Sequence, residues 1–280
     1  MRCDSAILPR MEVNPQIAIL GMGNLGGALA ESLRRAGYSV EAVKKSKQTK
    51  SAKALLKIRA KVVWFSVPDG EIARAAGDLA KKMDWKGRVA LHSSGALSSD
   101  ELEVLRKQGA AAASVHPLMT FVRGSRPLLA DVSFAVEGDA IALRVVRRIV
   151  KELGGRTYII RKEDKAAYHA WGTFASPLLT ALLVTAEQVA ALAGIKEKDV
   201  RQRMMPILRQ TLANYATLGA AGAFSGPIVR GDADTIQRHL RVLSETPEMR
   251  DVYWALARAA VQYLPGKNKG LVETALKFKQ

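Results

Sequence analysis

Short runs of apolar residues alternate with amphipathic stretches along the first half of this 280-residue chain. Such alternation is typical of a parallel sheet whose strands are joined by covering helices. It predicts strands at 17–20, 39–43, 61–67, 88–92, 111–115 and 133–136, and helices at 24–36, 50–58, 70–82, 98–107 and 140–153. The predicted fold class is therefore α/β, with a doubly wound parallel sheet.

The second half of the chain has long helical patterns in place of strands. One pattern covers 163–194 with an expected kink at Pro177, and the next covers 198–219 with an interruption at Pro206. Two shorter helices are predicted at 232–243 and 248–264.

These patterns divide the chain into an N-terminal tail at 1–15, an α/β domain at 16–160 and an all-helical domain at 161–280. The long helices are apolar around most of their circumference, so they must bury more than one face. A homodimer formed through the helical domain is the expected assembly.

Three glycines, Gly21, Gly23 and Gly26, stand between the first predicted strand and the first predicted helix. A GxGxxG spacing in this strand–turn–helix context marks a dinucleotide-binding turn. Gly21 permits the sharp turn, Gly23 lets a pyrophosphate approach the backbone, and Gly26 lets the helix pack closely. The helix N-terminus at Asn24 and Leu25 attracts the anion, so both are assigned to the cofactor site. The alternative is a tight turn without a ligand.

The second predicted strand runs into lysines instead of an acidic residue. Lys44, Lys45 and Lys47 follow the strand, whereas Glu41 lies inside it. An acid at the strand end would hold the ribose hydroxyls of NAD, whereas lysines offer point charges to the 2′-phosphate of NADP. NADP(H) is therefore the expected cofactor, with Lys44 and Lys45 as ligands. The alternative is a solvated basic loop.

Three further predicted strands end in small, hydroxyl or histidine residues, in the stretches SVPD at 66–69, HSSG at 92–95 and VHP at 115–117. In an open α/β sheet, ligands bind at the carboxyl ends of the strands. The residues assigned to the cofactor site on this ground are Ser66, Val67, Pro68, Ser93 and Ser94.

Three residues are candidates for proton transfer. Lys165 and His169 are four apart and share one helix face, where a buried lysine beside another cation can donate a proton to a carbonyl oxygen. His116 follows the fifth predicted strand. The alternatives are an exposed first turn for Lys165 and His169 and a turn histidine for His116. A hydrolytic Ser93–His116 pair is disfavoured because the chain has no GxSxG elbow and no evident orienting acid.

The segment SGPIVRGD at 225–232 is a candidate substrate site. Gly226 and Pro227 form a rigid turn, and Arg230 could hold a substrate carboxylate through two parallel hydrogen bonds. The alternative is an ordinary loop between helices. No metal site is predicted.

Composition narrows the cellular setting. The longest apolar stretches, such as 178–184, are much shorter than the roughly 18 residues of a membrane span, and the first fifteen residues lack the apolar core of a secretory signal. Cys3 is the only cysteine. We therefore expect a cytoplasmic protein without disulfides or a membrane partner.

The formal net charge of +17 raises nucleic-acid binding as a rival hypothesis. Basic residues are scattered through every segment, without a basic stripe interleaved with aromatics and without zinc-finger spacing. The densest cluster lies at 44–53, where it fits the NADP phosphate. Nucleic acid is therefore not the expected partner.

Seven stretches carry a resemblance to a known family: ILGMGNLGGALA, FSVPDGEIA, LHSSGAL, SVHPLMTF, FAVEGD, EDKAAYHAWGTFAS and GPIVRGD. Across residues 17 to about 264 the chain resembles bacterial Rossmann-like oxidoreductases with a C-terminal helical domain of unknown function. These are relatives of pyrroline-5-carboxylate reductase, ketopantoate reductase and deazaflavin-dependent NADP reductases. The resemblance implies an NADP-binding domain, a helical dimerisation domain of the 6-phosphogluconate dehydrogenase C-terminal type, and an active site between them.

The same resemblance bears on the catalytic residues. In 6-phosphogluconate-dehydrogenase-like relatives a catalytic lysine is followed four residues later by asparagine, and the matching positions here are Lys165 and His169. Histidine departs from that pattern, and Pro177 also stands where family members have asparagine.

The sequence thus predicts an NADPH-dependent reductase of a small carbonyl or imine compound, including 2-keto acids of the ketopantoate type. Lys165, assisted by His169 or His116, would exchange the proton, and Arg230 would anchor the substrate. An NADP-binding sensor or scaffold without turnover fits the same fold. A basic nucleic-acid-binding protein is the third hypothesis, and it predicts a steep salt dependence.

Overall fold

The computed structural model describes residues 16–43, 58–125 and 127–277. Within it the chain divides into two compact units, Met1–Phe174 and Ala175–Gln280. This division lies beyond residue 160 because the following helix buries Lys165 and Tyr168 within the first unit. The tail at 1–15, the expected helix at 50–58 except its last residue, and the lysines at 44, 45 and 47 lie outside the described residues.

The described part of the first unit forms one seven-stranded sheet in the order β2-β1-β3-β4-β5-β6-β7. The strands are β1 (Ile17–Leu20), β2 (Val40–Val43), β3 (Val62–Phe65), β4 (Val89–His92), β5 (Ala111–Pro117), β6 (Ser133–Gly138) and β7 (Arg156–Ile159). The first five run parallel. β1, β3 and β4 are buried along their whole length, which explains their continuous apolar sequences.

Two features of the sheet differ from the prediction. β6 pairs with β5 in the antiparallel direction, so the sheet is not parallel throughout. The connection at 118–132 contains no helix in its described residues, and a parallel pair would need a crossover connection, usually a helix. β7 was not predicted, because its four residues are exposed or half-buried at the sheet edge and lack an apolar run.

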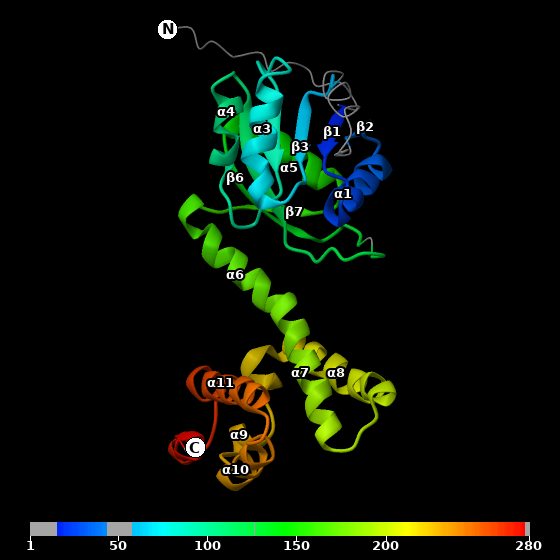
Figure 1. Cartoon of the computed structure of the whole chain (residues 1–280). Coiled ribbons are helices and arrows are strands. Elements are labelled where there is room, and N and C mark those ends of the chain that lie inside the picture. The colour runs from blue at the N-terminus through cyan, green and yellow to red at the C-terminus, as the bar shows by residue number, and fades with distance from the viewer. Residues whose placement is uncertain (1–15, 44–57, 126, 278–280) are drawn as a thin grey trace. The chain divides into compact units, whose positions relative to one another are not determined.

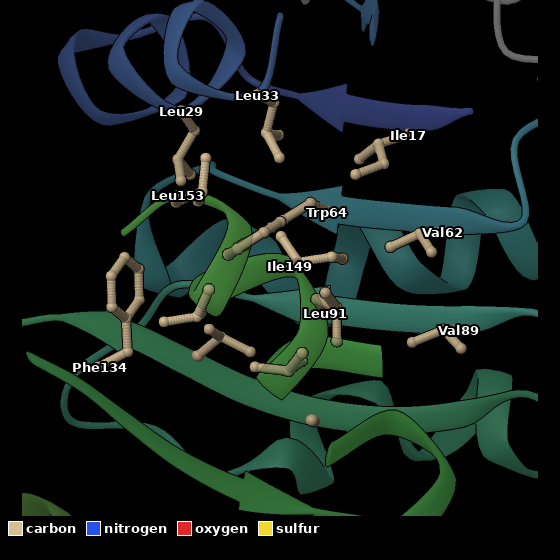
Figure 2. Close-up of a cluster of buried hydrophobic side chains, with 14 of the residues drawn as sticks. Ile17, Leu29, Leu33, Val62, Trp64, Val89, Leu91, Phe134, Ile149 and Leu153 are labelled. Atoms are coloured by element: carbon tan, nitrogen blue, oxygen red, sulfur yellow. The ribbon is translucent and has the colours of Figure 1, made fainter. Parts of the chain in front are cut away.

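Helices cover both faces of the sheet (Figure 1). They are α1 (Asn24–Arg35), α3 (Ile72–Ala80), α4 (Glu103–Arg106) and α5 (Ala140–Glu152), with short 3₁₀ helices η1 (Asp69–Glu71) and η2 (Ser99–Leu102). After β7 the chain continues through the 3₁₀ helix η3 (Lys162–Asp164) into α6 (Lys165–Ala175). Neighbouring side chains of β1 point to opposite cores: Ile17 joins the core under α1 and α5, and Ala18 joins the core under α3 and α4. Figure 2 shows Trp64 and Leu91 in the first of these cores. The doubly wound architecture is therefore confirmed.

The second unit is helical. Its helices are α7 (Pro177–Leu192), α8 (Glu197–Ala223), α9 (Pro227–Arg230), α10 (Ala233–Val242), α11 (Pro247–Tyr263) and α12 (Lys269–Lys277). The expected break at Pro177 is confirmed, since Ser176 before it has non-helical backbone angles. The expected interruption at Pro206 is wrong: α8 continues through Pro206 and breaks at Gly219, where φ is 69° and a residue without Cβ is favoured. The short helices α9 and α12 were not predicted.

One helical stretch, Lys162–Leu192, is long and apolar enough to cross a membrane by length and composition alone. This differs from the expectation that no stretch would reach that length, because α6 and α7 follow each other with only Ser176 between them. A single such helix among the described residues is weak evidence for a membrane span, although its most apolar window is not buried in the structure, as the core helix of a soluble protein would be.

Candidate active site

Two of the three glycines in the turn after β1 stand where a side chain would clash. Gly21 has φ of 93°, and a Cβ there would lie 2.4 Å from the Ser66 carbonyl oxygen. A Cβ on Gly26 would lie 1.9 Å from the Gly21 carbonyl oxygen. At Gly23, by contrast, nothing lies within 4 Å of the Cβ position. Two glycines therefore allow close packing, and the third leaves open space in front of the turn.

The start of α1 is suited to an anion. Gly23 is its N-cap, no side chain caps it, and the first turn holds no acidic residue. The positive end of the helix dipole and the first backbone N–H groups are thus available to a phosphate. Asn24 Nδ2 donates to the Phe121 carbonyl oxygen over 3.2 Å, and Leu25 packs against the core.

A cavity of about 570 Å³ lies beside this helix start. Its walls come from α1 and the segment after β5: Met22, Gly23, Asn24, Gly27, Ala28, Glu31, Arg34, Arg35, Val122, Arg123, Gly124 and Ser125. Ser66 Oγ, at the end of β3, is buried without a hydrogen-bond partner among the described residues. An uncapped helix, an open glycine and an orphaned hydroxyl at one sheet edge fit a dinucleotide.

The loop after β4 is held by its own side chains. His92 is fully buried; its Nδ1 accepts from the Ser94 N–H over 3.1 Å, and its Nε2 donates to the Ser98 carbonyl oxygen over 2.9 Å. Burial lowers the pKa of His92 to about 4, so the ring is neutral. Ser93 Oγ accepts from Trp64 Nε1 over 2.8 Å, and Ser94 Oγ donates to Asp69 Oδ2 over 2.8 Å. Both hydroxyls thus hydrogen-bond within the protein, and their assignment to the cofactor site stays a prediction.

Lys165 is buried in the first turn of α6, with 1% of its surface exposed. Its Nζ donates to Ser114 Oγ over 2.8 Å and to the Ser94 carbonyl oxygen over 3.2 Å. Burial lowers the pKa of Lys165, and the carboxylates of Glu137 and Asp69 partly oppose this shift. The alternative of an exposed first turn therefore fails for Lys165.

His116 and His169 gather around Gly95. His116 Nδ1 lies 2.7 Å from Tyr168 Oη, and the two histidine rings are 6.2 Å apart. A Cβ on Gly95 would lie 2.9 Å from His116 Nε2 and 2.7 Å from His169 Cδ2. His169 is exposed on α6, one turn after Lys165.

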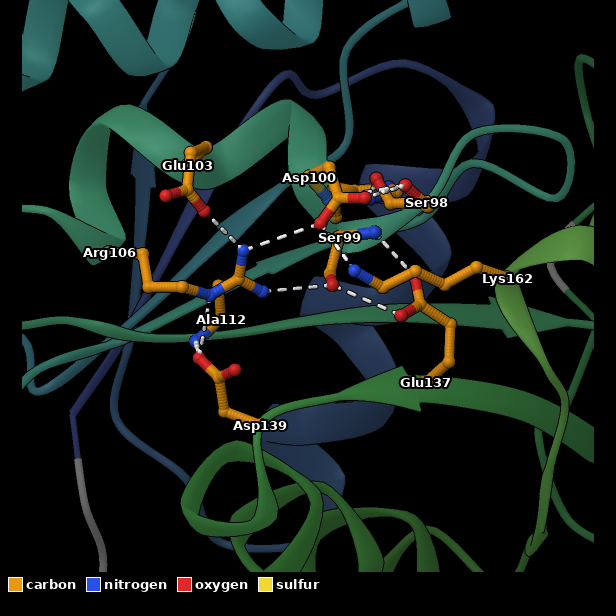
Figure 3. A network of polar contacts seen from close by, with 10 residues as sticks. Ser98, Ser99, Asp100, Glu103, Arg106, Ala112, Glu137, Asp139 and Lys162 are labelled. Carbon is orange, nitrogen blue, oxygen red and sulfur yellow. Dashed lines mark hydrogen bonds and ion pairs between the residues drawn. The ribbon is translucent and has the colours of Figure 1, made fainter.

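A polar network anchors the segment before α6 (Figure 3). Lys162 forms an ion pair with Asp100. The buried Glu137 on β6 accepts hydrogen bonds from the Ser99 N–H and hydroxyl, and Arg106 donates to the same hydroxyl over 3.0 Å. This network ties the chain just before α6 to η2 and β6, which places the first turn of α6 at the loop after β4.

The other predicted residues are placed as follows. Val67 is half-buried beside Gly21, and Pro68 is exposed as the N-cap of η1. In the second unit, Gly226 has φ of 101° before α9, which Pro227 begins and Arg230 ends. The structure therefore supports the predicted rigid turn within that unit.

Sequence reasoning did not assign Asp69, Gly95, Ser114 and Tyr168 to the site. Tyr168 follows Lys165 by three positions and so shares its helix face, which was a usable signal. Ser114 lies two positions before His116 on β5, which places both on one face of the strand.

The sheet order, the glycine turn and the helix that follows it define a Rossmann-like domain. Residues 8–117 match the family model of the Rossmann-like domain, and residues 132–260 match the model described as a domain of unknown function, DUF2520. The two matches follow one another along the chain. No curated protein matches its sequence.

Several solved structures share the fold over nearly the whole chain. A Bacteroides fragilis protein named as an NADP oxidoreductase is 21% identical, with 88% of this chain and 97% of that one covered and a TM-score of 0.72. A reductive aminase from Aspergillus terreus, in complex with NADPH and ethyl levulinate, is 14% identical, with 93% and 99% covered and a TM-score of 0.63. An imine reductase from Myxococcus stipitatus, in complex with NADP⁺, is 16% identical, with 94% and 99% covered and a TM-score of 0.63.

Proposed function

We propose that this protein is a cytoplasmic NADPH-dependent oxidoreductase that reduces a small carbonyl or imine compound. One observation carries the proposal: the first unit holds both the uncapped start of α1, which follows β1, and the cluster in which Lys165 contacts Ser94 after β4 and Ser114 on β5. The carboxyl ends of β1, β3, β4 and β5 meet at one edge, where ligands of α/β sheets bind. The NADP-containing structures with the same fold support this reading.

In the proposed mechanism, NADPH would supply the hydride when bound. The start of α1 would hold its pyrophosphate, with Gly23 leaving room for the phosphate oxygens. The buried ammonium group of Lys165 stabilises negative charge that develops on the substrate oxygen, since a fixed charge in a water-poor site is worth more than in solution. His116 and His169 line the side from which the proton arrives.

For the substrate we propose a 2-keto acid of the ketopantoate type as the finer assignment. Arg230 stands at the end of α9, after the rigid turn at Gly226 and Pro227, and its side chain is exposed. A guanidinium group binds a carboxylate through two parallel hydrogen bonds. The KM values of several 2-keto acids, each compared with a ketone or aldehyde of similar skeleton that lacks the carboxylate, test this assignment.

The cofactor preference gives a first test. We expect NADPH to bind more tightly than NADH, because Lys44, Lys45 and Lys47 stand where an acid would select the ribose diol. Titration of both cofactors, followed by nicotinamide fluorescence, measures the difference. Lys44→Asp combined with Lys45→Asp should weaken NADPH selectively, whereas Lys107→Asp, on the exposed surface after α4, should not. Equal affinities in the unmodified protein would contradict the NADP assignment.

We also propose a homodimer formed through the second unit. α7 has no buried residue, and α8 buries only Val200. The large apolar side chains left exposed on these two helices include Leu178, Leu179, Val184, Leu192, Met205, Ile207, Leu212, Tyr215 and Leu218. A second copy is the occupant that fits, since obligate dimer interfaces are apolar and symmetric and α8 alone, at about 1.5 Å per residue, offers roughly 40 Å of surface.

Light scattering in detergent-free buffer should therefore give twice the 30.3 kDa mass of one chain. Leu212→Glu combined with Leu218→Glu should produce monomers, because both residues are 60% exposed on α8 and would carry charge into the interface. Val104→Glu, an exposed apolar position of the first unit, is the matched control. A 30.3 kDa particle at micromolar concentration, or cosedimentation with lipid vesicles, would contradict the dimer.

A further inference from the structure

Tyr168 is held rigidly against His116. Tyr168 is 7% exposed, its Oη lies 2.7 Å from His116 Nδ1, and the two rings meet edge to face at 5.4 Å and 85°. The rings of Tyr158 and Trp171 also pack edge to face on Tyr168, each at 6.1 Å. The His116 ring therefore has a fixed orientation as well as a fixed partner.

The protonation of this pair follows from its surroundings. Burial raises the pKa of Tyr168, so the phenol keeps its hydrogen. Burial is the largest cause that lowers the pKa of His116, which falls to about 4. The charges of Lys165 and His169 lower this pKa further, and the charge of Asp69 raises it. At neutral pH His116 is a neutral ring with one N–H. Nδ1 and the Tyr168 hydroxyl share one hydrogen bond, and the tautomer in which the hydroxyl donates carries the ring hydrogen on Nε2.

Gly95 packs closely against the Nε2 edge of the His116 ring. A Cβ there would lie 2.9 Å from His116 Nε2 and 3.0 Å from its Cδ2, within contact distance of a ring that Tyr168 prevents from moving. The same Cβ would lie 2.7 Å from Cδ2 of the exposed His169. The Nε2 edge of the half-buried His116 ring thus lies beside Gly95 and the exposed His169.

We propose that Tyr168 is a positioning residue that fixes His116 with its hydrogen on Nε2, and that the site consequently takes a carbonyl oxygen and not an imine nitrogen. The second part rests on the proposed function. A carbonyl oxygen has lone pairs that accept the Nε2–H hydrogen bond, as neutral imidazoles do for carbonyl substrates in other enzymes. An imine receives hydride as its iminium form, whose nitrogen carries a hydrogen and a positive charge that the ammonium of Lys165 repels.

The reaction balances with NADPH as the reductant. Hydride from NADPH adds to the carbonyl carbon, the π pair of the C=O bond moves to the oxygen, and NADP⁺ results. The oxygen then takes a proton from a water molecule that enters past the exposed His169, and the resulting hydroxide takes up a proton from the solvent. Throughout this step the Nε2–H of His116 donates a hydrogen bond and does not ionise.

The tautomer is tested without cofactor by ¹⁵N NMR of the histidine rings in the full-length protein, with His116 assigned through His116→Gln. We expect a protonated Nε2 and an unprotonated Nδ1 that persist from pH 8 to about pH 5, because His116 resists protonation above about pH 4. Tyr168→Phe keeps the ring packing and should give a mixture of tautomers. A hydrogen on Nδ1, titration near pH 6.5, or an unchanged tautomer in Tyr168→Phe would overturn the positioning role.

The second unit provides a matched control. His239 Nδ1 lies 3.0 Å from Tyr253 Oη, with the rings 5.7 Å apart, but this pair is exposed and outside the proposed site. Tyr253→Phe should leave the His116 signals unchanged.

The substrate class is tested with pairs of a ketone and the cyclic imine of the same carbon skeleton, at saturating NADPH. We expect the ketone to be reduced at least tenfold faster, and Tyr168→Phe to lower kcat without changing the Kd for NADPH. Faster reduction of the imine would overturn the carbonyl assignment. Failure to bind NADPH would instead refute the proposed function, while the NMR result would still decide the role of Tyr168.

Discussion

Alanine at Gly23 is expected to weaken NADPH binding at least tenfold, a loss of about 1.4 kcal/mol or more. No heavy atom lies within 4 Å of the Cβ position, and the backbone angles of Gly23, φ −69° and ψ −164°, are open to any residue. The folded state therefore accepts the methyl group, but the methyl fills the space through which a pyrophosphate would approach the N-terminus of α1. Fluorescence titration measures the affinity, and denaturant unfolding checks that stability changes by less than about 1 kcal/mol.

Gly77→Ala is the matched control for this prediction. Gly77 lies within α3, nothing lies within 4 Å of its Cβ position, and it does not line the cavity beside α1. We expect unchanged NADPH affinity and a gain in stability of up to about 1 kcal/mol, as for glycine to alanine within a helix. Equal affinity losses in the two variants, or none in either, would show that the turn holds no dinucleotide.

Removal of the Lys165 ammonium group is expected to lower turnover by about 10²- to 10⁴-fold while NADPH affinity stays the same. Lys165 Nζ is buried against Ser94 and Ser114 at the edge where the reaction is proposed, and the start of α1 holds the cofactor independently. Lys165→Met tests the charge with little change in volume, and Lys165→Ala tests the whole side chain. Turnover is followed by loss of NADPH absorbance.

Lys162→Met is the control for the lysine prediction, since Lys162 precedes the same helix but is half-exposed and paired with Asp100. It should keep turnover within a few-fold of the unmodified protein. If Lys165→Met also retained turnover within a few-fold, Lys165 would have only a structural role.

Much of the first unit could be predicted because its central strands are buried on both faces. Val62–Phe65 is an uninterrupted apolar run, and its position between β1 and β4 requires this. β7 could not be predicted, since edge exposure removes the apolar run that marks a strand. The predicted interruption at Pro206 was wrong. Proline is disfavoured inside a helix, yet α8 continues through Pro206, and its first non-helical backbone angles are at Gly219.

The parts of the site that depend on local sequence were visible in advance. The glycine spacing defines the turn, and the four-residue spacing of Lys165 and His169 places both on one helix face. The contact between His116 and Tyr168 joins residues 52 positions apart, and only the folded sheet brings them together. Lys165 was predicted as a candidate, but its burial against Ser114 required the register of β5 beside β4.

Oxidation of NADPH by the unmodified protein, measured by absorbance across a panel of ketones, 2-keto acids and cyclic imines, tests the proposed function most directly. We predict steady oxidation with at least one carbonyl compound and none in its absence. NADPH binding without oxidation across the whole panel would contradict the assignment as a reductase and would favour an NADP-binding sensor or scaffold.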